Sequence, residues 1–419
     1  MLSREDNELL VRVGPGTPMG ELFRRFWTPV MLAGELGGPD SAPVRVNILG
    51  EKLVAFRDTA GAIGLIDAYC PHRRANLFWG RNEEHGLRCV YHGWKFDVGG
   101  QCTDLPNAPE GVNLKDRVTT ASYPTLERGG LIWAYLGPRE VQPEFPNYEG
   151  FHVPPSHQFI RKMIAKGNYL QLMEGDVDSS HVGFLHSRLD KQPPVGSRAD
   201  ANTFQDVMPR WFPQETDYGL MLSAQRNAGP DKYQWRVNQY LMPYITLVAA
   251  PPGLPILHQV RVPVDDETSM HFRCFIHPER PLTAEEIAVY NAGVIVPDVN
   301  PETFETRENA GNEYLIDRDE QRTTTYTGIK SIVAQDLAVT QDQGGLIADR
   351  SREYLVSSDR AIIMLRKRLL TPLKALQQGI EPAEPRARSF AVRPGDFILP
   401  RDVSVDEGAR EYRLVGAGT

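Results

Sequence analysis

Two short clusters, each with one cysteine and one histidine, constrain this chain more than any other feature. The first reads Cys-Pro-His at 70–72 and the second Cys-Val-Tyr-His at 89–92, with sixteen residues between them. Both are followed by glycine and aromatic residues that suit tight, well-packed loops. Because cysteine is rare and both clusters offer one thiolate and one imidazole, we expect two loops that fold over a shared metal centre.

Cys70, His72, Cys89 and His92 form the ligand set of a Rieske [2Fe–2S] centre. In such a centre two cysteines hold one iron and two histidines hold the other, which raises the reduction potential to roughly -150 to +300 mV. The centre can then accept electrons from a reductase and pass them to an iron site. Zinc is the main alternative, but structural zinc sites usually pair Cys with Cys and His with His within each arm.

The same centre occurs in electron-transfer subunits of respiratory complexes, where each arm carries a further cysteine that joins a disulfide. Here the arms contain Pro71, Arg73, Val90 and Tyr91 in place of such a cysteine. The remaining cysteines, Cys102 and Cys274, are expected to be buried thiols.

A second group of candidate ligands lies in NYLQLMEGDVDSSHVGFLH, residues 168–186. On a helix Asp178 and His181 share a face, whereas His186 lies about 140° around from His181. The helix should therefore bulge or end between the histidines, and Gly183 is well placed for that. Two such histidines and a distant carboxylate make the facial triad of a non-heme Fe(II) site, with positions open for O2 and substrate. Histidine pairs are more often structural, so the prediction depends on their occurrence beside the Cys/His clusters.

At these residues the sequence resembles the Rieske oxygenases, in particular their phthalate 4,5-dioxygenase-like branch. The resemblance covers residues 5–30, 69–97, the histidine segment and 334–362. It implies an α+β fold with an N-terminal antiparallel β Rieske domain over residues 1–150. Residues 151–419 would form the catalytic domain, an antiparallel sheet flanked by helices in the helix-grip arrangement of Bet v1-like and START-like proteins.

The resemblance also assigns roles to residues. It makes His181 and His186 ligands of a mononuclear iron, with Asp336 as the third ligand and Asp342 as its rival. Asp178 matches the family's bridging aspartate, which contacts an iron-ligand histidine and a cluster histidine of the neighbouring subunit and so makes the electron path. Such a carboxylate also fixes the orientation and tautomer of a ligand imidazole.

The implied partners are an NADH-dependent flavin or iron–sulfur reductase, O2, an aromatic substrate and further copies of the chain in a homotrimer or homohexamer. Many substrates of this branch are aromatic carboxylates, which arginine binds in a bidentate manner. Arg236 and Asn202 match the positions of two arginines in phthalate-using relatives, so a dicarboxylate is not expected. Arg188 and Arg198 are weaker candidates.

The reaction can be hydroxylation, dihydroxylation or O-demethylation, since all three use the same iron site. Two other functions compete with an oxygenase. A pure electron-transfer protein would leave the second metal site and over 200 residues unexplained, and a zinc-stabilised binding module would be colourless.

The net charge of -8 and the absence of Lys/Arg runs argue against nucleic-acid binding. No segment approaches the roughly 18 apolar residues of a membrane span, and the charged N-terminus lacks the apolar core of a signal peptide. We therefore expect a cytoplasmic protein without a membrane anchor.

Local patterns predict several elements. Thr17 and Pro18 predict the start of a helix, and residues 43–58 predict a hairpin that turns at Gly50-Glu51. Residues 160–190 read as a strand passing into a helix, and 215–280 as alternating strands.

The segment 350–378 is expected to be helical, with three marked positions. Ser357 or Ser358 would cap the helix, Pro372 would kink it and Gly379 would end it. The tail after residue 380 is expected to pack as an extended arm on the surface.

Overall fold

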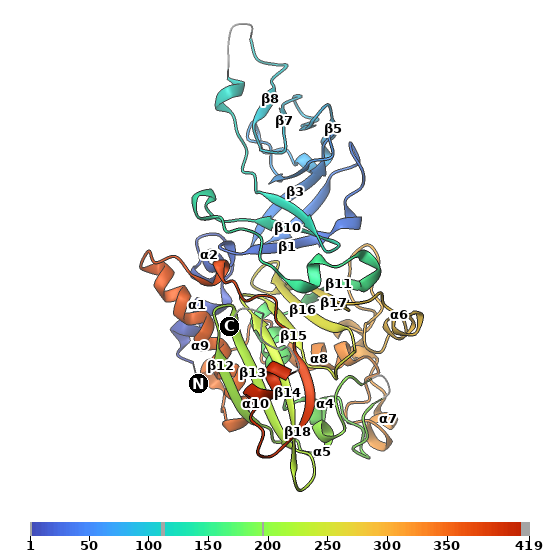
Figure 1. Ribbon diagram of the computed structural model, residues 1–419. Coiled ribbons are helices and arrows are strands. Elements are labelled where there is room, and N and C mark those ends of the chain that lie inside the picture. Colours follow the sequence, from blue (N-terminus) through green and yellow to red (C-terminus); the bar gives the residue numbers. More distant parts are fainter. Residues whose placement is uncertain (1, 110–113, 195–196, 412–419) are drawn as a thin grey trace. The chain divides into compact units, whose positions relative to one another are not determined.

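The computed structural model describes residues 2–109, 114–194 and 197–411, and the chain divides into two compact units. One unit spans Val13–Pro143, and the other joins the segment up to Arg12 to the chain from Glu144 onward. The first is built from antiparallel sheets and the second from a large sheet with helices (Figure 1). This confirms the predicted α+β class with an N-terminal β domain.

The unit Val13–Pro143 begins with the predicted helix. Helix α2 (Pro18–Arg24) starts at the predicted proline, and the Thr17 hydroxyl caps it by accepting the Gly20 N–H at 3.2 Å. Three antiparallel sheets follow within the described residues: β1 (Trp27–Leu32), β10 (Leu131–Tyr135) and β9 (Thr125–Arg128); β2 (Val44–Ile48), β3 (Glu51–Arg57) and β4 (Ile63–Asp67); and β5 (Arg81–Glu83), β6 (Gly86–Arg88), β7 (Lys95–Phe96) and β8 (Cys102–Asp104).

The hairpin between β2 and β3 turns one residue earlier than predicted. Leu49 and Gly50 form its two-residue loop, both with positive φ (49° and 75°), and Ile48 already pairs with Glu51. A type I′ hairpin loop needs positive φ at both positions, and a glycine stands at one of them.

An antiparallel eight-stranded sheet dominates the described part of the second unit. Strand β14 changes partners along its length, pairing with β18 through its first half and with β15 through its end. In order across the sheet the strands are β11 (Gln158–Lys166), β17 (Thr268–Ile276), β16 (Ile256–Pro263), β15 (Ile245–Val248), β14 (Lys232–Leu241), β13 (Gly219–Asn227) and β12 (Arg210–Glu215), with β18 (Gly395–Pro400) beside β14.

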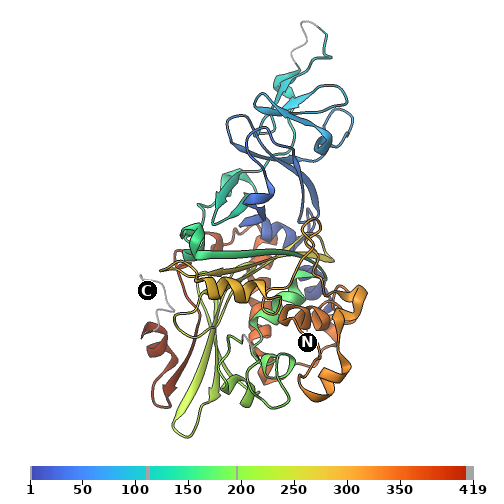
Figure 2. The same cartoon turned by 90° about the vertical axis from the view of Figure 1, so that its right-hand side faces the viewer.

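Helices α3, α8 and α9 pack together on one face of this sheet (Figure 2). Strand alternation puts Trp235 and Val237 of β14 in a core with α10 on the opposite face, so the residue between them, Arg236, points toward the helices. The helices are α1 (Arg4–Val11), α3 (Tyr169–Val177), α4 (Val182–Leu185), α5 (Asn202–Gln205), α6 (Ala284–Asn291), α7 (Arg318–Thr323), α8 (Ile332–Thr340), α9 (Arg360–Gln377) and α10 (Val405–Glu411). Among the described residues, no helix combines the length and the apolar character needed to cross a membrane.

Three local predictions near the chain ends were incomplete or wrong. Helix α1 was not predicted, although Ser3 caps it. Helix α9 begins only at Arg360, after a short 3-10 turn over Ser357–Asp359, so neither serine caps it. It ends before Gly379, as predicted, but the tail after residue 380 supplies strand β18 to the sheet instead of a surface arm.

A buried ion network ties α3 to α9. The Glu174 carboxylate, 6% exposed, accepts from Arg350 Nε and Nη2 at 2.9 and 3.0 Å and from Arg366 Nε at 2.6 Å. Burial would raise the pKa of Glu174, but the two guanidinium groups outweigh it and lower that pKa. The network holds α3 in place, and α3 leads directly into the candidate iron site.

We expect Glu174→Gln to destabilise this unit by about 3–5 kcal/mol, because it leaves the buried Arg350 without a carboxylate and leaves Arg366 only its pair with Glu353. Urea unfolding followed by far-UV circular dichroism would measure the loss, with the exposed Glu302→Gln as a matched control. Equal stability of the two variants would contradict a structural role for the network.

Candidate functional site

The two Cys/His arms have the same backbone hydrogen bonds. In the first, Cys70 N–H donates to the Ala75 carbonyl and Arg74 N–H to the Cys70 carbonyl, both at 2.9 Å. In the second, Cys89 N–H donates to Trp94 and Gly93 N–H to Cys89, at 2.8 and 2.9 Å. Residues 74 and 93, at matching positions, both have positive φ. The two arms thus share one backbone loop, although His72 follows its cysteine by two residues and His92 by three.

The side chains of the arms fit an iron–sulfur centre. Cys70 and Cys89 are buried, and burial raises the pKa of Cys70 to about 11, with the nearby Cys89 raising it further. The ring centres of His72 and His92 lie 4.5 Å apart, and both rings are partly exposed. Two buried thiols beside two half-buried imidazoles are the donors that a Rieske cluster needs, since bound iron would stabilise the thiolates.

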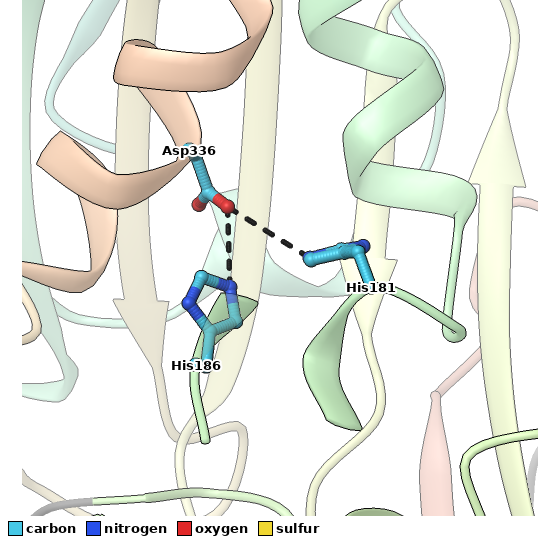
Figure 3. Close-up of side chains that lie close together, drawn as sticks. All are labelled: His181, His186 and Asp336. Carbon is cyan, nitrogen blue, oxygen red and sulfur yellow. Dashed lines mark ion pairs between the residues drawn. The ribbon is translucent and has the colours of Figure 1, made fainter. Parts of the chain in front are cut away.

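The second unit brings His181, His186 and Asp336 together (Figure 3). The Nε2 atoms of His186 and His181 lie 3.1 and 3.8 Å from Asp336 Oδ1. Donors about 2.1 Å from a metal and at right angles to one another lie roughly 3 Å apart, so this spacing suits a shared ion. The donor set is the facial two-histidine, one-carboxylate triad typical of non-heme Fe(II). Asp342, the rival ligand, is exposed beyond the end of α8.

The helix that carries the histidines was predicted to bend or end at Gly183, and that prediction was wrong. Helix α3 ends at Val177, with Asp178 as its C-cap, and α4 is a single turn with His181 at its N-cap and His186 at its C-cap. Gly183 lies inside α4, where an added Cβ would come within 2.7 Å of Val207. Close packing of α4, not a bend, therefore accounts for this glycine.

Asp178 links the two helices through its carboxylate. Its oxygens accept the N–H groups of Ser180 at 2.7 Å and His181 at 3.2 Å, which starts α4 in the manner of a helix cap. Asp178 Oδ2 also lies 3.4 Å from His181 Nδ1. Burial would raise the pKa of Asp178, but His181 and these N–H groups lower it, so the carboxylate is charged beside the histidine.

The electrostatics favour a bound cation. Burial would raise the pKa of Asp336, but His186 and His181 outweigh it and lower that pKa to about 2. Burial likewise would lower the pKa of His181, yet Asp178 and Asp336 raise it. The site thus concentrates ionised carboxylate beside imidazole, which a divalent ion would neutralise.

Gln335, which the sequence analysis did not single out, orients His186. Its Nε2 donates to the Ile329 carbonyl at 2.6 Å, so its Oε1 faces His186 Nδ1 at 2.7 Å and accepts that proton. The His186 side chain is 9% exposed. Its Nε2 therefore presents a lone pair toward Asp336 and the metal position.

We expect Gln335→Leu to weaken Fe(II) binding roughly 10- to 100-fold, as is usual when a ligand histidine loses its supporting hydrogen bond. Anaerobic titration of the iron-depleted protein with Fe(II) would measure this. Gln335→Glu keeps an acceptor for His186 and should bind more tightly than the leucine variant, and the exposed Gln377→Leu serves as control. Unchanged affinity in Gln335→Leu would exclude the orienting role.

A cavity of about 120 Å³ opens beside the triad and is lined by all three of its residues. Arg198, Arg236 and Arg273 also line it. Arg236 is buried and pairs with Asp396 at 2.8 Å.

The other predicted substrate residues are not among the described residues that line this cavity. The side-chain amide of Asn202 donates a hydrogen bond to Asp200 Oδ1 at 2.6 Å, and Arg188 forms an ion pair with Asp190 at 2.9 Å. Arg273 was missed, although an arginine inside the apolar strand FRCFI is itself a signal.

Comparison with known proteins identifies the family. Residues 26–124 match the Rieske [2Fe-2S] domain, and residues 134–400 match the family described as LigXa C-terminal domain like. The 3-chlorobenzoate-3,4-dioxygenase oxygenase subunit of Comamonas testosteroni is 37% identical over 99% of both chains. The phthalate 4,5-dioxygenase oxygenase subunit of Pseudomonas putida is 38% identical over 90% of this chain and 88% of that relative. The chain belongs to the Rieske oxygenase alpha subunits.

The fold also agrees with that of a solved structure. The Pseudomonas putida CBB5 NdmA QL mutant with theobromine superposes with a TM-score of 0.61 at 22% identity, over 92% of this chain and 99% of that one. Rieske oxygenases carry a [2Fe–2S] cluster and a mononuclear iron, and they receive electrons from a separate reductase. The comparisons thus support an oxygenase component rather than an electron carrier without oxygenase activity.

Proposed function

We propose that this Rieske oxygenase acts on an aromatic carboxylate. The observation that carries the proposal is a single cavity that is lined both by the metal triad and by three arginines. The relatives named for 3-chlorobenzoate and phthalate are consistent with it. Apolar residues of the same cavity, including Val248, Leu257 and Ile295, supply a surface for an aromatic ring.

We assign the metal ligands as follows. Within residues 1–150, Cys70 and Cys89 would hold one cluster iron, and His72 and His92 the other. Within residues 151–419, His181, His186 and Asp336 would hold the mononuclear iron. When bound, these groups supply single electrons and an open ferrous position at which O2 is activated.

The surrounding residues keep this site in order. Gln335 fixes the tautomer of His186, and Asp178 sets the orientation of His181 through a charged contact. The apolar walls exclude bulk water from the ring of the substrate, so that oxygen is directed to the bound molecule.

We further propose that the chain works as a homotrimer or homohexamer with an NADH-dependent flavin or iron–sulfur reductase, in the cytoplasm where NADH is available. A hollow of about 480 Å³ reaches Asp178 and is lined by acidic residues, among them Asp349, Glu353 and Asp359. The exposed Arg73 and Arg74 directly follow His72. This charge complementarity supports the approach of one subunit's cluster to the iron of another.

Product analysis tests the proposed function. The purified protein would be supplied with an NADH-linked reductase, O2 and a panel of plain, chlorinated and methoxylated benzoates, and products read by mass. Gain of two oxygens and two hydrogens identifies a dioxygenase, whereas loss of a methyl group with release of formaldehyde identifies a demethylase. The corresponding neutral benzamides would be offered in parallel, and oxidation of these without oxidation of any benzoate would reject the substrate class.

A further inference from the structure

Arg273 is a buried cation that no acidic side chain balances directly. It lies on β17 with 3% of its surface exposed and lines the cavity beside the triad. Nη1 donates to the neutral Gln259 amide oxygen at 2.9 Å, and buried Nε has no partner. Among residues 2–109, 114–194 and 197–411, no carboxylate lies within 4.0 Å of this guanidinium and Nη2 makes no hydrogen bond. Burying an unpaired charge is costly, so the position calls for an anion.

The neighbouring buried arginines show what Arg273 lacks. On the adjacent strand β16, Arg261 holds Asp176 through Nε and Nη2, both at 2.7 Å. Arg236 donates a hydrogen bond from Nη1 to Asp396 Oδ2 at 2.8 Å. The Nε and Nη2 edge that Arg261 uses for a carboxylate is thus the edge of Arg273 that has no protein partner.

Arg198 adds a second cation to the lining of the same cavity. Its guanidinium carbon lies 5.2 Å from the centre of the Phe275 ring, and that of Arg273 lies 5.7 Å from the same ring. Arg198 donates to the Pro255 carbonyl and, within the described chain, has no carboxylate within 4.0 Å. Burial lowers the pKa of Arg273 to about 10; Arg261 and Arg198 act in the same direction, and the more distant carboxylates of Asp336 and Asp176 offset this only in part. The two positive charges near this buried ring therefore repel each other, and a bound anion would relieve the repulsion.

We propose that Arg273, assisted by Arg198, binds the single carboxylate group of the substrate, while Arg236 serves as the structural partner of Asp396. This inference rests on the proposed function and specifies the chemistry of its substrate. One anion satisfies the charge shared by the two guanidinium groups, and the planar edge of Arg273 matches a carboxylate. An aromatic ring attached to it contacts Val248, Leu257 and Ile295.

The test is equilibrium binding to the holoenzyme, which does not depend on turnover. The probes are 3-chlorobenzoate and its neutral counterpart 3-chlorobenzamide. We expect the wild type to prefer the carboxylate, and Arg273→Gln to weaken carboxylate binding roughly 10- to 100-fold, as loss of a charged hydrogen bond does. Amide binding should change little, and the exposed Arg322→Gln should match the wild type.

Two further measurements separate this from misfolding and from a role of Arg236. Without ligand, Arg273→Gln should melt no lower than the wild type, since it removes an unbalanced buried charge. The double variant Arg236→Gln/Asp396→Asn, which removes both partners of a pair, should keep the preference for the carboxylate. The proposal is overturned if the preference survives in Arg273→Gln or disappears in the double variant. It is also overturned if the wild type shows no preference, an outcome that leaves an oxygenase of neutral aromatics intact.

Discussion

Replacing Asp336 by alanine is expected to remove the mononuclear iron and leave the Rieske cluster in place. The reason is geometric: Asp336 Oδ1 is the atom that both histidine Nε2 atoms face, at 3.1 and 3.8 Å. Without it, only two neutral donors remain. Iron content should fall from about three to about two per chain, while the visible spectrum of the cluster persists. Turnover should fall by more than the roughly 10- to 100-fold expected for an outer hydrogen-bond partner.

Asp342→Ala is the matched control, because it removes the rival carboxylate only six residues away. Asp342 is exposed, so its loss should change neither iron content nor stability. If Asp342→Ala loses iron and Asp336→Ala retains it, the ligand assignment is wrong. If both variants retain three irons, the triad is not the mononuclear site.

The features that sequence alone predicted are those whose physics is local. Thr17 and Pro18 mark the start of α2 because a cap and a fixed φ act within one turn. The two Cys/His arms were recognisable for the same reason, since each loop closes through hydrogen bonds within six residues. His181 and His186 also come from one short segment, although only the structure shows where the helix before them ends.

The features that sequence did not yield depend on distant partners. Asp336 joins the triad from about 150 residues away and was placed only by resemblance. Gln335 looks like an ordinary helix residue until the Ile329 carbonyl fixes the direction of its amide. Arg273 could be interpreted as an anion-binding residue only from the structure, in which the carboxylates of Asp176 and Asp396 are paired with other arginines.

Two elements near the chain ends were not predicted, for a related reason. Strand β18 exists because β14 offers a free edge along its first half, which sequence periodicity in the tail cannot reveal. Helix α1 is short, and Asn7 is held through the Ala348 carbonyl and Arg350, more than 340 residues away. Short elements of this kind are stabilised by tertiary contacts more than by their own propensity.

Replacing Asp178 by asparagine is expected to keep both metal sites and nearly abolish turnover, by about 100-fold or more. An asparagine oxygen can still accept the Ser180 N–H, and asparagine and aspartate cap helices about equally well, so α4 should still form, although the amide nitrogen cannot accept the His181 N–H that Oδ2 holds at 3.2 Å. What is lost is the negative charge 3.4 Å from His181 Nδ1. Substrate-dependent O2 consumption, iron content and the rate at which O2 reoxidises the reduced cluster would be measured together.

Asp178→Ala separates the charge from the cap. It removes both, so it should lose turnover like the asparagine variant and, in addition, about 1 kcal/mol of stability from the missing cap. Near-normal turnover in Asp178→Asn would show that the charge has no part in the reaction and that Asp178 only shapes the chain. Loss of iron in Asp178→Asn would instead show that the carboxylate holds His181 in its ligand orientation. Retained iron with slow reoxidation of the cluster is the outcome that fits a role in electron delivery, because only that role separates metal binding from turnover.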